Sequence, residues 1–174
     1  MSGVIAVSYF LEALFSKLSK VKFILVFSEG VVYDRNIQGI SGTFDDFISL
    51  FNFEAMNKEI KDSLLQSVSI VITHSNRSNE EYLKNFQSIS DRLSQEKRLR
   101  NIRHKDTIVE MMKHVVEGKR INSFKLAEPG VEISKNSLLQ DLEKTNWQFF
   151  DSKKSRATVE PSQKLIILPF EHDF

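Results

Sequence analysis

The sequence predicts an α/β protein in which helices flank a parallel β-sheet in three layers. Two short apolar runs without alternation, at residues 23–27 and 68–72, are typical of strands covered on both faces. Longer segments with apolar residues at three- and four-residue spacing separate these runs and indicate helices. The 6 glycines and 3 prolines are too few for the many tight turns of a sandwich or barrel. Strands joined by long helical connections predict parallel βαβ units.

The first elements are expected to be a helix and a strand. Residues 7–18 carry an apolar stripe at helical spacing, and residues 21–27 form the strand that follows. Charged residues interrupt this apolar N-terminal stretch, so neither a membrane span nor a signal peptide is predicted. A doubly wound domain normally opens with a strand. We therefore expect the front strand of the fold to be missing from this chain or supplied by another one.

Two helices are predicted between the first and second strands. Residues 39–43 are expected to form a flexible turn, and residues 44–51 a helix. Its first turn would hold Asp45 and Asp46, where negative charge suits the helix dipole. A short helix over residues 55–66 then leads to the second strand.

The second strand is followed by a long helix over about residues 80–100. Thr107 and Glu110 have the spacing of a capping box, which predicts that the next helix opens at Thr107. Gly118 is expected to end that helix in the left-handed conformation. A third strand is predicted over residues 121–126.

The chain is predicted to be one α/β domain over residues 1–150, with a last helix over about residues 134–147. Residues 151–174 are predicted to be a polar linker that carries a short C-terminal strand or docking tail at residues 165–168.

The composition excludes several kinds of site. The chain has no cysteine, which rules out disulfides, thiolate metal sites and a cysteine nucleophile. A formal net charge of +1 favours no nucleic-acid partner. The histidines, at 74, 104, 114 and 172, are not spaced as metal ligands, so no metal site and no resident cofactor is predicted. A cysteine-free chain without a membrane span fits a cytoplasmic protein.

The first candidate site is the polar loop that ends the second strand, with Thr73, His74 and Asn76 as its candidate ligand-binding residues. Open parallel sheets bind their ligands at the carboxyl ends of the strands. A histidine at that position can stack on a base or donate a hydrogen bond. The alternative is that Thr73 and Asn76 cap the following helix or form a local turn, although Asn79 is an equally good cap.

The second candidate is a basic face at the end of the long helix, represented by Arg98, Arg100 and Arg103. Such a cluster suits contacts with phosphate or with an acidic partner. No aromatic residues are interleaved with it, and a solvated helix face is the simpler interpretation.

Several stretches resemble, in order and spacing, the rear (C-terminal) half of a divergent P-loop GTPase-like domain. The resemblance is to the class that includes septin-like and immune-associated nucleotide-binding GTPases. Residues 9–15 and 20–27 are similar to the helix and strand that follow the family's magnesium-side motif, and residues 44–51 to the next helix. Residues 68–76 resemble the strand that ends in the base-specificity motif Asn/Thr-Lys-x-Asp, which some members write Thr-His-x-Asp. Residues 122–125 fall near the last base-contacting strand.

This resemblance implies a P-loop NTPase-like fold that is truncated or degenerate. Asn76 stands where the family has an acidic residue, and an amide offers the guanine edge one acceptor group in place of two. The phosphate loop and the magnesium motif would lie before residue 1, so hydrolysis is not expected and GTP or GDP would bind weakly at most. The domain would then act through a protein partner or through self-association. Two alternatives stay open, a helical interaction module with no nucleotide role and a small α/β enzyme with an unseen site.

Overall fold

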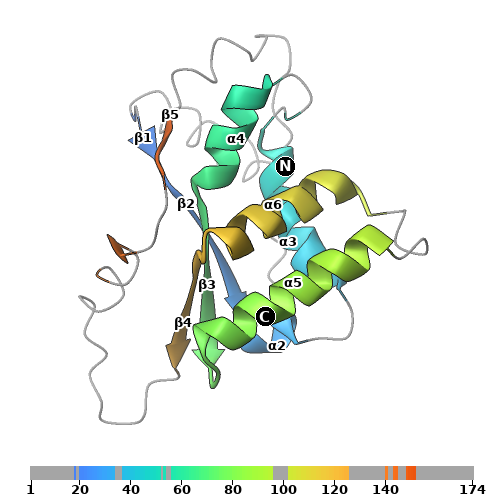
Figure 1. The fold of residues 1–174 in the computed structure, drawn as a ribbon, viewed down its shortest axis with the longest axis vertical. Coiled ribbons are helices and arrows are strands. Elements are labelled where there is room, and N and C mark those ends of the chain that lie inside the picture. The colour runs from blue at the N-terminus through green and yellow to red at the C-terminus, as the bar shows by residue number, and fades with distance from the viewer. Residues whose placement is uncertain are drawn as a thin grey trace, which may run out of the picture.

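The computed structural model confirms a mixed α/β architecture, in which helices flank a three-stranded parallel sheet (Figure 1). It describes residues 18, 20–33, 37–51, 53, 56–95, 102–125, 140, 143–144 and 148–151. The elements, in chain order, are β1 (Lys20–Val21), β2 (Phe23–Ser28), α2 (Glu29–Val32), α3 (Gln38–Ser49), α4 (Lys58–Gln66), β3 (Val68–Ser75), α5 (Asn79–Gln95), α6 (Lys105–Glu117), β4 (Ile121–Lys125) and β5 (Phe150–Asp151).

The sheet has the strand order β2-β3-β4, and each strand is parallel to its neighbour. Leu25 lies opposite Ile70, which in turn lies opposite Ile121. Each connection moves one strand further in the same direction, so right-handed crossovers place both connections on the same face. Figure 1 shows α3, α5 and α6 together on one side of the strands. These helices cover one face of the sheet. A layer of helices on the other face, which would complete the predicted three layers, stays a prediction.

The core lies between the sheet and these helices. The side chains of Val68, Ile70 and Ile72 on β3 are fully buried. On β2, the ring of Phe27 lies 5.8 Å from that of Phe44 on α3 and 6.0 Å from that of Phe86 on α5, measured between ring centroids. Phe27 therefore packs against one helix from each of the two crossover connections, which holds α3 and α5 in place relative to β2.

The strand β2 does not have two covered faces, although its apolar run predicts them. Leu25 and Phe27 are buried, whereas Ile24 and Val26 on the opposite face are 43% and 58% exposed. The helices α3 and α5 pack against the face of β2 that carries Phe27, and in the described part of the chain β2 also lies at the edge of the sheet. The central strand β3 fits the prediction, since all five residues from Val68 to Ile72 are buried.

A short pair of strands joins a late part of the chain to the start of the sheet. β5 runs antiparallel to β1, with Val21 opposite Phe150. The backbone N–H of Gln148 donates to the carbonyl of Gln66, at the end of α4. Phe150 is 2% exposed, and its ring packs 6.1 Å from that of Phe23. Asp151, predicted to begin a polar linker, thus ends a strand.

The predicted turn at residues 39–43 is wrong, because these residues lie inside α3. Asp45 and Asp46 are therefore in the middle of that helix and not in its first turn. The apolar stripe of α3 extends back through Ile40, which is 1% exposed. Gly39 serves close packing here, since a Cβ at this position would lie 3.1 Å from Cγ1 of Val31 in α2.

The ends of α5 and α6 also differ from prediction. α6 begins at Lys105, so Thr107 lies within the helix and forms no capping box with Glu110. His104 precedes α6 in the left-handed region (φ 50°), and its Nδ1 lies 2.8 Å from a carboxylate oxygen of Asp45 on α3. The same type of box instead opens α5, at Ser78 and Glu81. The N–H of Ser78 donates to the Glu81 carboxylate, and the N–H of Glu81 donates to the Ser78 hydroxyl oxygen.

A buried arginine connects α4, β3 and α6. Arg120 is 5% exposed, and its Nε donates to the carbonyl of Val68 at 2.9 Å. Its Nη2 donates to the carbonyls of Leu65 (3.2 Å) and His114 (2.7 Å), in the last turns of α4 and α6. Burial lowers the pKa of Arg120, an effect that Glu117 opposes. The His114 carbonyl also accepts from the N–H of Gly118, so the guanidinium adds a second donor there, and it links the ends of two helices.

Gly118 makes room for this arginine. Its φ of −77° is not left-handed, contrary to prediction, and the positive φ falls on Lys119. A Cβ on Gly118 would lie 2.6 Å from the Nη1 atom of Arg120. The glycine is therefore required for close approach of a side chain.

Several predicted features lie outside the described residues. They are the helix at residues 7–18, the end of the long helix beyond Gln95 and the strand at residues 165–168. Residues 140 and 143–144 are helical, as predicted for the last helix, whose other residues are likewise not described. Among the described helices, none combines the length and the apolar character needed to cross a membrane.

We predict that Arg120→Met lowers the free energy of unfolding by about 2 to 3 kcal/mol, because three carbonyls lose a buried donor. Urea denaturation measures the change, and Arg103→Met, at an exposed position, is the control expected to stay within about 0.5 kcal/mol.

Gly118→Ala should destabilise the wild type by about 1 to 2 kcal/mol, since the new methyl group meets the guanidinium. It should cost less in the Arg120→Met background, and strictly additive changes would contradict the packing role of Gly118.

Candidate binding site at the carboxyl end of the sheet

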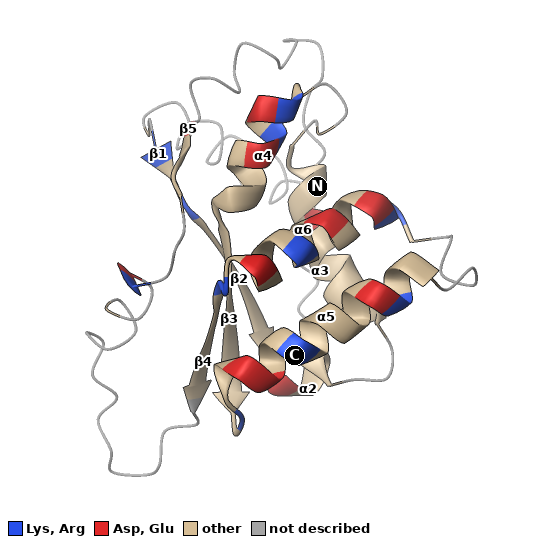
Figure 2. Ribbon diagram, viewed as in Figure 1, with Lys and Arg blue, Asp and Glu red and all other residues tan. Residues whose placement is uncertain are grey.

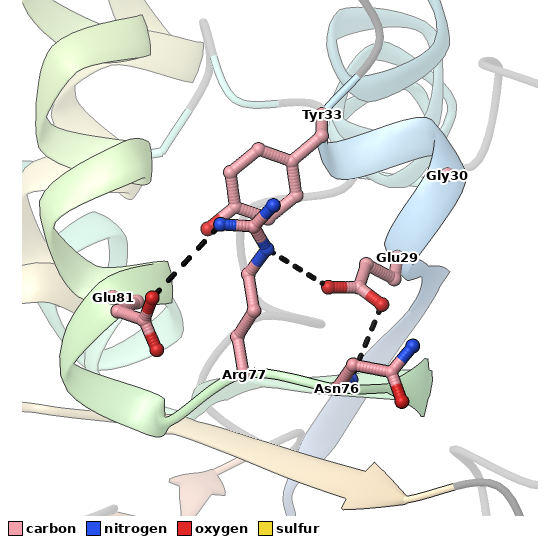
Figure 3. A pocket seen from close by; sticks show the side chains of 6 residues that line it. All are labelled: Glu29, Gly30, Tyr33, Asn76, Arg77 and Glu81. Atoms are coloured by element: carbon pink, nitrogen blue, oxygen red, sulfur yellow. Dashed lines mark hydrogen bonds and ion pairs between the residues drawn. The ribbon is translucent and has the colours of Figure 1, made fainter.

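A surface cavity of about 570 Å³ lies where β2 and β3 end (Figure 3). Its lining residues are Glu29, Gly30, Tyr33, Asn76, Arg77 and Glu81. Open parallel α/β folds bind their ligands at this place, beyond the carboxyl ends of the strands. The position of the candidate site thus agrees with the one expected from the sequence.

Three segments supply the lining. Glu29 and Gly30 belong to α2, which follows β2 without a gap, and Tyr33 comes directly after α2. Asn76 and Arg77 follow β3 directly. Glu81 stands in the first turn of α5, in the capping box with Ser78. Because β2 and β3 are parallel neighbours, the residues that follow them meet at one edge.

Arg77 is the central side chain of the cavity. Its Nε lies 3.1 Å from a carboxylate oxygen of Glu29, and its Nη1 lies 3.9 Å from one of Glu81. The guanidinium carbon lies 4.1 Å from the centroid of the Tyr33 ring. Figure 3 shows the guanidinium against this ring and between the two carboxylates. The side chain of Arg77 is 47% exposed, so water and salt screen these contacts and each contributes little to stability.

The charges of the cavity limit what it can bind. Two carboxylates and one guanidinium leave one excess negative charge among the lining residues. An anionic ligand such as a phosphate would be repelled by both glutamates and would compete with them for Arg77. The six lining residues include no serine, cysteine or histidine, and both of their carboxylates lie within 4 Å of the Arg77 guanidinium. The arrangement suits a small ligand or side chain that donates hydrogen bonds.

Two groups at the cavity have shifted ionisation. Burial raises the pKa of Tyr33, although the Arg77 guanidinium opposes the shift. Tyr33 is therefore a neutral phenol near neutral pH. Hydrogen bonds from the backbone and hydroxyl of Ser78 lower the pKa of Glu81, which keeps this carboxylate ionised.

The predicted ligand loop forms the floor of this region, but most of its polar groups bind the protein itself. The Thr73 hydroxyl donates to the carbonyl of Phe27 at 3.3 Å. The backbone N–H of Asn76 donates to a carboxylate oxygen of Glu29 at 3.2 Å. His74 is exposed, with a φ of 56°, and is not among the lining residues. Of the three predicted residues only Asn76 lines the cavity, and base recognition by this loop stays a prediction.

The predicted basic face is described only at Arg103, which is exposed in the turn before α6. Arg98 and Arg100 lie outside the described residues, so the structure does not test the face.

Sequence reasoning missed Glu29, Tyr33, Arg77 and Glu81. A signal was available for two of them. Glu29 lies two residues after the first predicted strand and Arg77 five residues after the second, and parallel pairing of these strands brings the opposite charges to the same end of the sheet. The contribution of Tyr33 depends on the turn after α2, which no local pattern predicts.

We predict that the Glu81 capping box makes stability depend on pH in the acidic range. The folded-state pKa of Glu81 is lowered from its ordinary value of 4.5, so its stabilising effect is complete above that value and is lost as pH falls through the folded-state pKa. In urea denaturation, Glu81→Gln should therefore show a smaller loss of stability between pH 7 and pH 3 than the wild type. Glu80→Gln, at the neighbouring exposed position, is the matched control. Equal pH dependence in wild type and Glu81→Gln would contradict the role of the box.

Comparisons with known proteins gave no match: no family model fits the sequence, and neither a curated protein nor a solved structure resembles the chain at the level required for a match.

Proposed function

We propose that the chain is a non-catalytic α/β domain that acts through protein contacts, and that its principal contact is self-association along the edge of β2. The single observation that carries the proposal is the exposed apolar face of this edge strand. Parallel sheets are usually covered on both faces. Here Ile24 and Val26 are 43% and 58% exposed on a strand that has no charged residue between Phe23 and Ser28.

The apolar stripe continues beyond β2. Phe149 is 56% exposed, and the ammonium group of Lys22 lies 4.5 Å from the centroid of its ring. Lys22, Ile24 and Val26 alternate along the chain, so their side chains share one face. We call Ile24, Val26 and Phe149 the β2 stripe. Figure 2 shows that the strands of the sheet are almost free of charged residues, whereas the helices carry both signs.

A second copy of the chain is the occupant that best fits this surface. In the described part of the chain, β2 pairs with β3 on one side only. An edge strand offers backbone groups to any strand of matching length. Two β2 strands related by a two-fold axis would pair antiparallel and extend one sheet into the other. Their uncharged sequence avoids repulsion between like charges, which would oppose pairing of a charged strand with its own copy.

The cavity at the sheet edge supports a role without catalysis. The loop that resembles a base-specificity motif has Asn76 in place of the acidic residue. The neighbouring cavity has excess negative charge, and its guanidinium is already engaged by Glu29 and Glu81. These features disfavour a nucleoside triphosphate at this edge.

Sedimentation velocity tests self-association. We expect the wild type to dimerise with a dissociation constant of about 1 to 100 µM. Val26→Lys should weaken the dimer at least about tenfold, because it places a charge in the stripe. Leu50→Lys, at an apolar residue that is 42% exposed at the end of α3 and is not part of the β2 stripe, is the matched control. A wild type that stays monomeric at several hundred micromolar, or equal effects of the two lysines, would overturn the proposed contact.

Calorimetry with GTP and GDP, each with Mg²⁺, tests the nucleotide question separately. We expect no binding tighter than about 1 mM, which corresponds to about −4 kcal/mol. Micromolar affinity that His74→Ala or Asn76→Ala removes would refute the non-catalytic, degenerate interpretation.

A further inference from the structure

Three side chains with metal-binding atoms converge between α4 and α6. They are Asp62 on α4 and Glu110 and His114 on α6, and one oxygen or nitrogen atom of each lies within 4.8 Å of those of the other two. This cluster is distinct from the cavity at the sheet edge, with which it shares no residue. No sequence motif indicates this cluster, because the cluster has a single histidine and its three residues come from two different helices.

The helix geometry explains how the cluster forms. Glu110 and His114 are four residues apart on α6, so they lie one above the other on the same helix face. Ile60 and Leu64 on α4 and Met111 and Val115 on α6 are buried, which shows that both helices pack into the core. Asp62 and His114 are half-buried, and Glu110 is exposed. Figure 2 shows acidic residues on both helices.

Two of the three side chains of the cluster are carboxylates, and Lys113 on α6 lines the same surface pocket as Glu110. Asp62 and Glu110 are two carboxylates at short range, and like charges at this separation repel each other. Among the described residues, no hydrogen bond or ion pair is formed by any of the three side chains. His104 offers a contrast, since its imidazole is paired with a single carboxylate, that of Asp45.

A second, independent feature holds the two helices α4 and α6 in register. Arg120 binds the carbonyl of His114 itself, and it also binds the carbonyl of Leu65, one helical turn after Asp62. The backbones that carry two of the three side chains are therefore fixed to the same guanidinium. A metal site needs such support, because ligands on rigid elements lose less freedom when the ion binds.

We propose that Asp62, Glu110 and His114 form a binding site for a divalent first-row transition metal ion. One imidazole and two carboxylates are a donor set that suits Zn²⁺ or Mn²⁺ and similar ions, and the imidazole disfavours Mg²⁺ and Ca²⁺. Ligand atoms around a tetrahedral Zn²⁺ are about 3.4 Å apart. The donors at up to 4.8 Å must therefore move inward by about 1 to 1.5 Å, which the exposed side chain of Glu110 permits. Water would complete the coordination on the exposed side.

Calorimetric titration of the tag-free, chelator-treated chain with ZnCl₂ alone tests the site. We expect one ion per chain, with a dissociation constant of about 1 to 10 µM. A hundredfold excess over that constant should raise the midpoint of thermal unfolding by about 5 to 10 °C. Asp62→Asn and His114→Ala should each weaken binding at least about tenfold and abolish the thermal shift.

Two controls separate this site from other donors on the surface. His74→Ala removes an exposed histidine, and Asp106→Asn removes an exposed carboxylate from the first turn of α6, so neither should change Zn²⁺ affinity. Circular dichroism checks that each variant is folded. Should His114→Ala unfold, Zn²⁺ affinity is measured instead with Glu110→Gln, which changes an exposed residue. Absent binding, binding that survives Asp62→Asn and Glu110→Gln, or displacement of Zn²⁺ by 5 mM Mg²⁺ would overturn the proposal.

Discussion

The hydrogen bonds of the Arg120 guanidinium are the constraint on which the rest of the structure depends. Two helices end at this point, and the central strand begins there. Without the guanidinium, the carbonyls of Leu65 and Val68 would lose this donor, whereas that of His114 would keep only the N–H of Gly118; an unpaired buried acceptor costs about 1 to 3 kcal/mol. The same contact sets the distance between α4 and α6, and hence the convergence of Asp62 with His114. The buried guanidinium thus links α4, β3 and α6 through hydrogen bonds to their backbone carbonyls.

The second constraint is the handedness of the two connections. A strand order that advances in one direction places both crossovers on one face, and the described helices α3, α5 and α6 pack against that face. Two surface features are related to this arrangement of the strands. The carboxyl ends of β2 and β3 bring Glu29 and Arg77 together, and the uncovered face of β2 exposes Ile24 and Val26. The cavity and the stripe are therefore two consequences of one topology.

Much of the fold could be predicted from local patterns. The strands β3 and β4 and the helices α4 and α5 lie close to their predicted positions, because hydrophobic periodicity reports which face of an element is buried. Periodicity cannot show whether a strand is central or at an edge, and this is why the exposure of β2 was missed. Turn signals failed where packing overrode them, as at Gly39 and Gly118. For the candidate site, the edge of the sheet was predictable, but Tyr33 and Glu81 were not, since their contribution depends on contacts distant in sequence.

The β1–β5 pair has a consequence for the folding pathway. Lys20 pairs with Asp151, so most of the chain lies between the two partners in sequence. The strands β2, β3 and β4, in contrast, pair with strands roughly 50 residues away. Closing a long loop costs more entropy than closing a short one, so β5 should dock after the sheet has formed. Before that step Phe23 and Phe51 lack the ring of Phe150 that packs against them in the native state. A chain that is still being synthesised would pass through this state, with aromatic surface open to aggregation beside an unpaired strand edge.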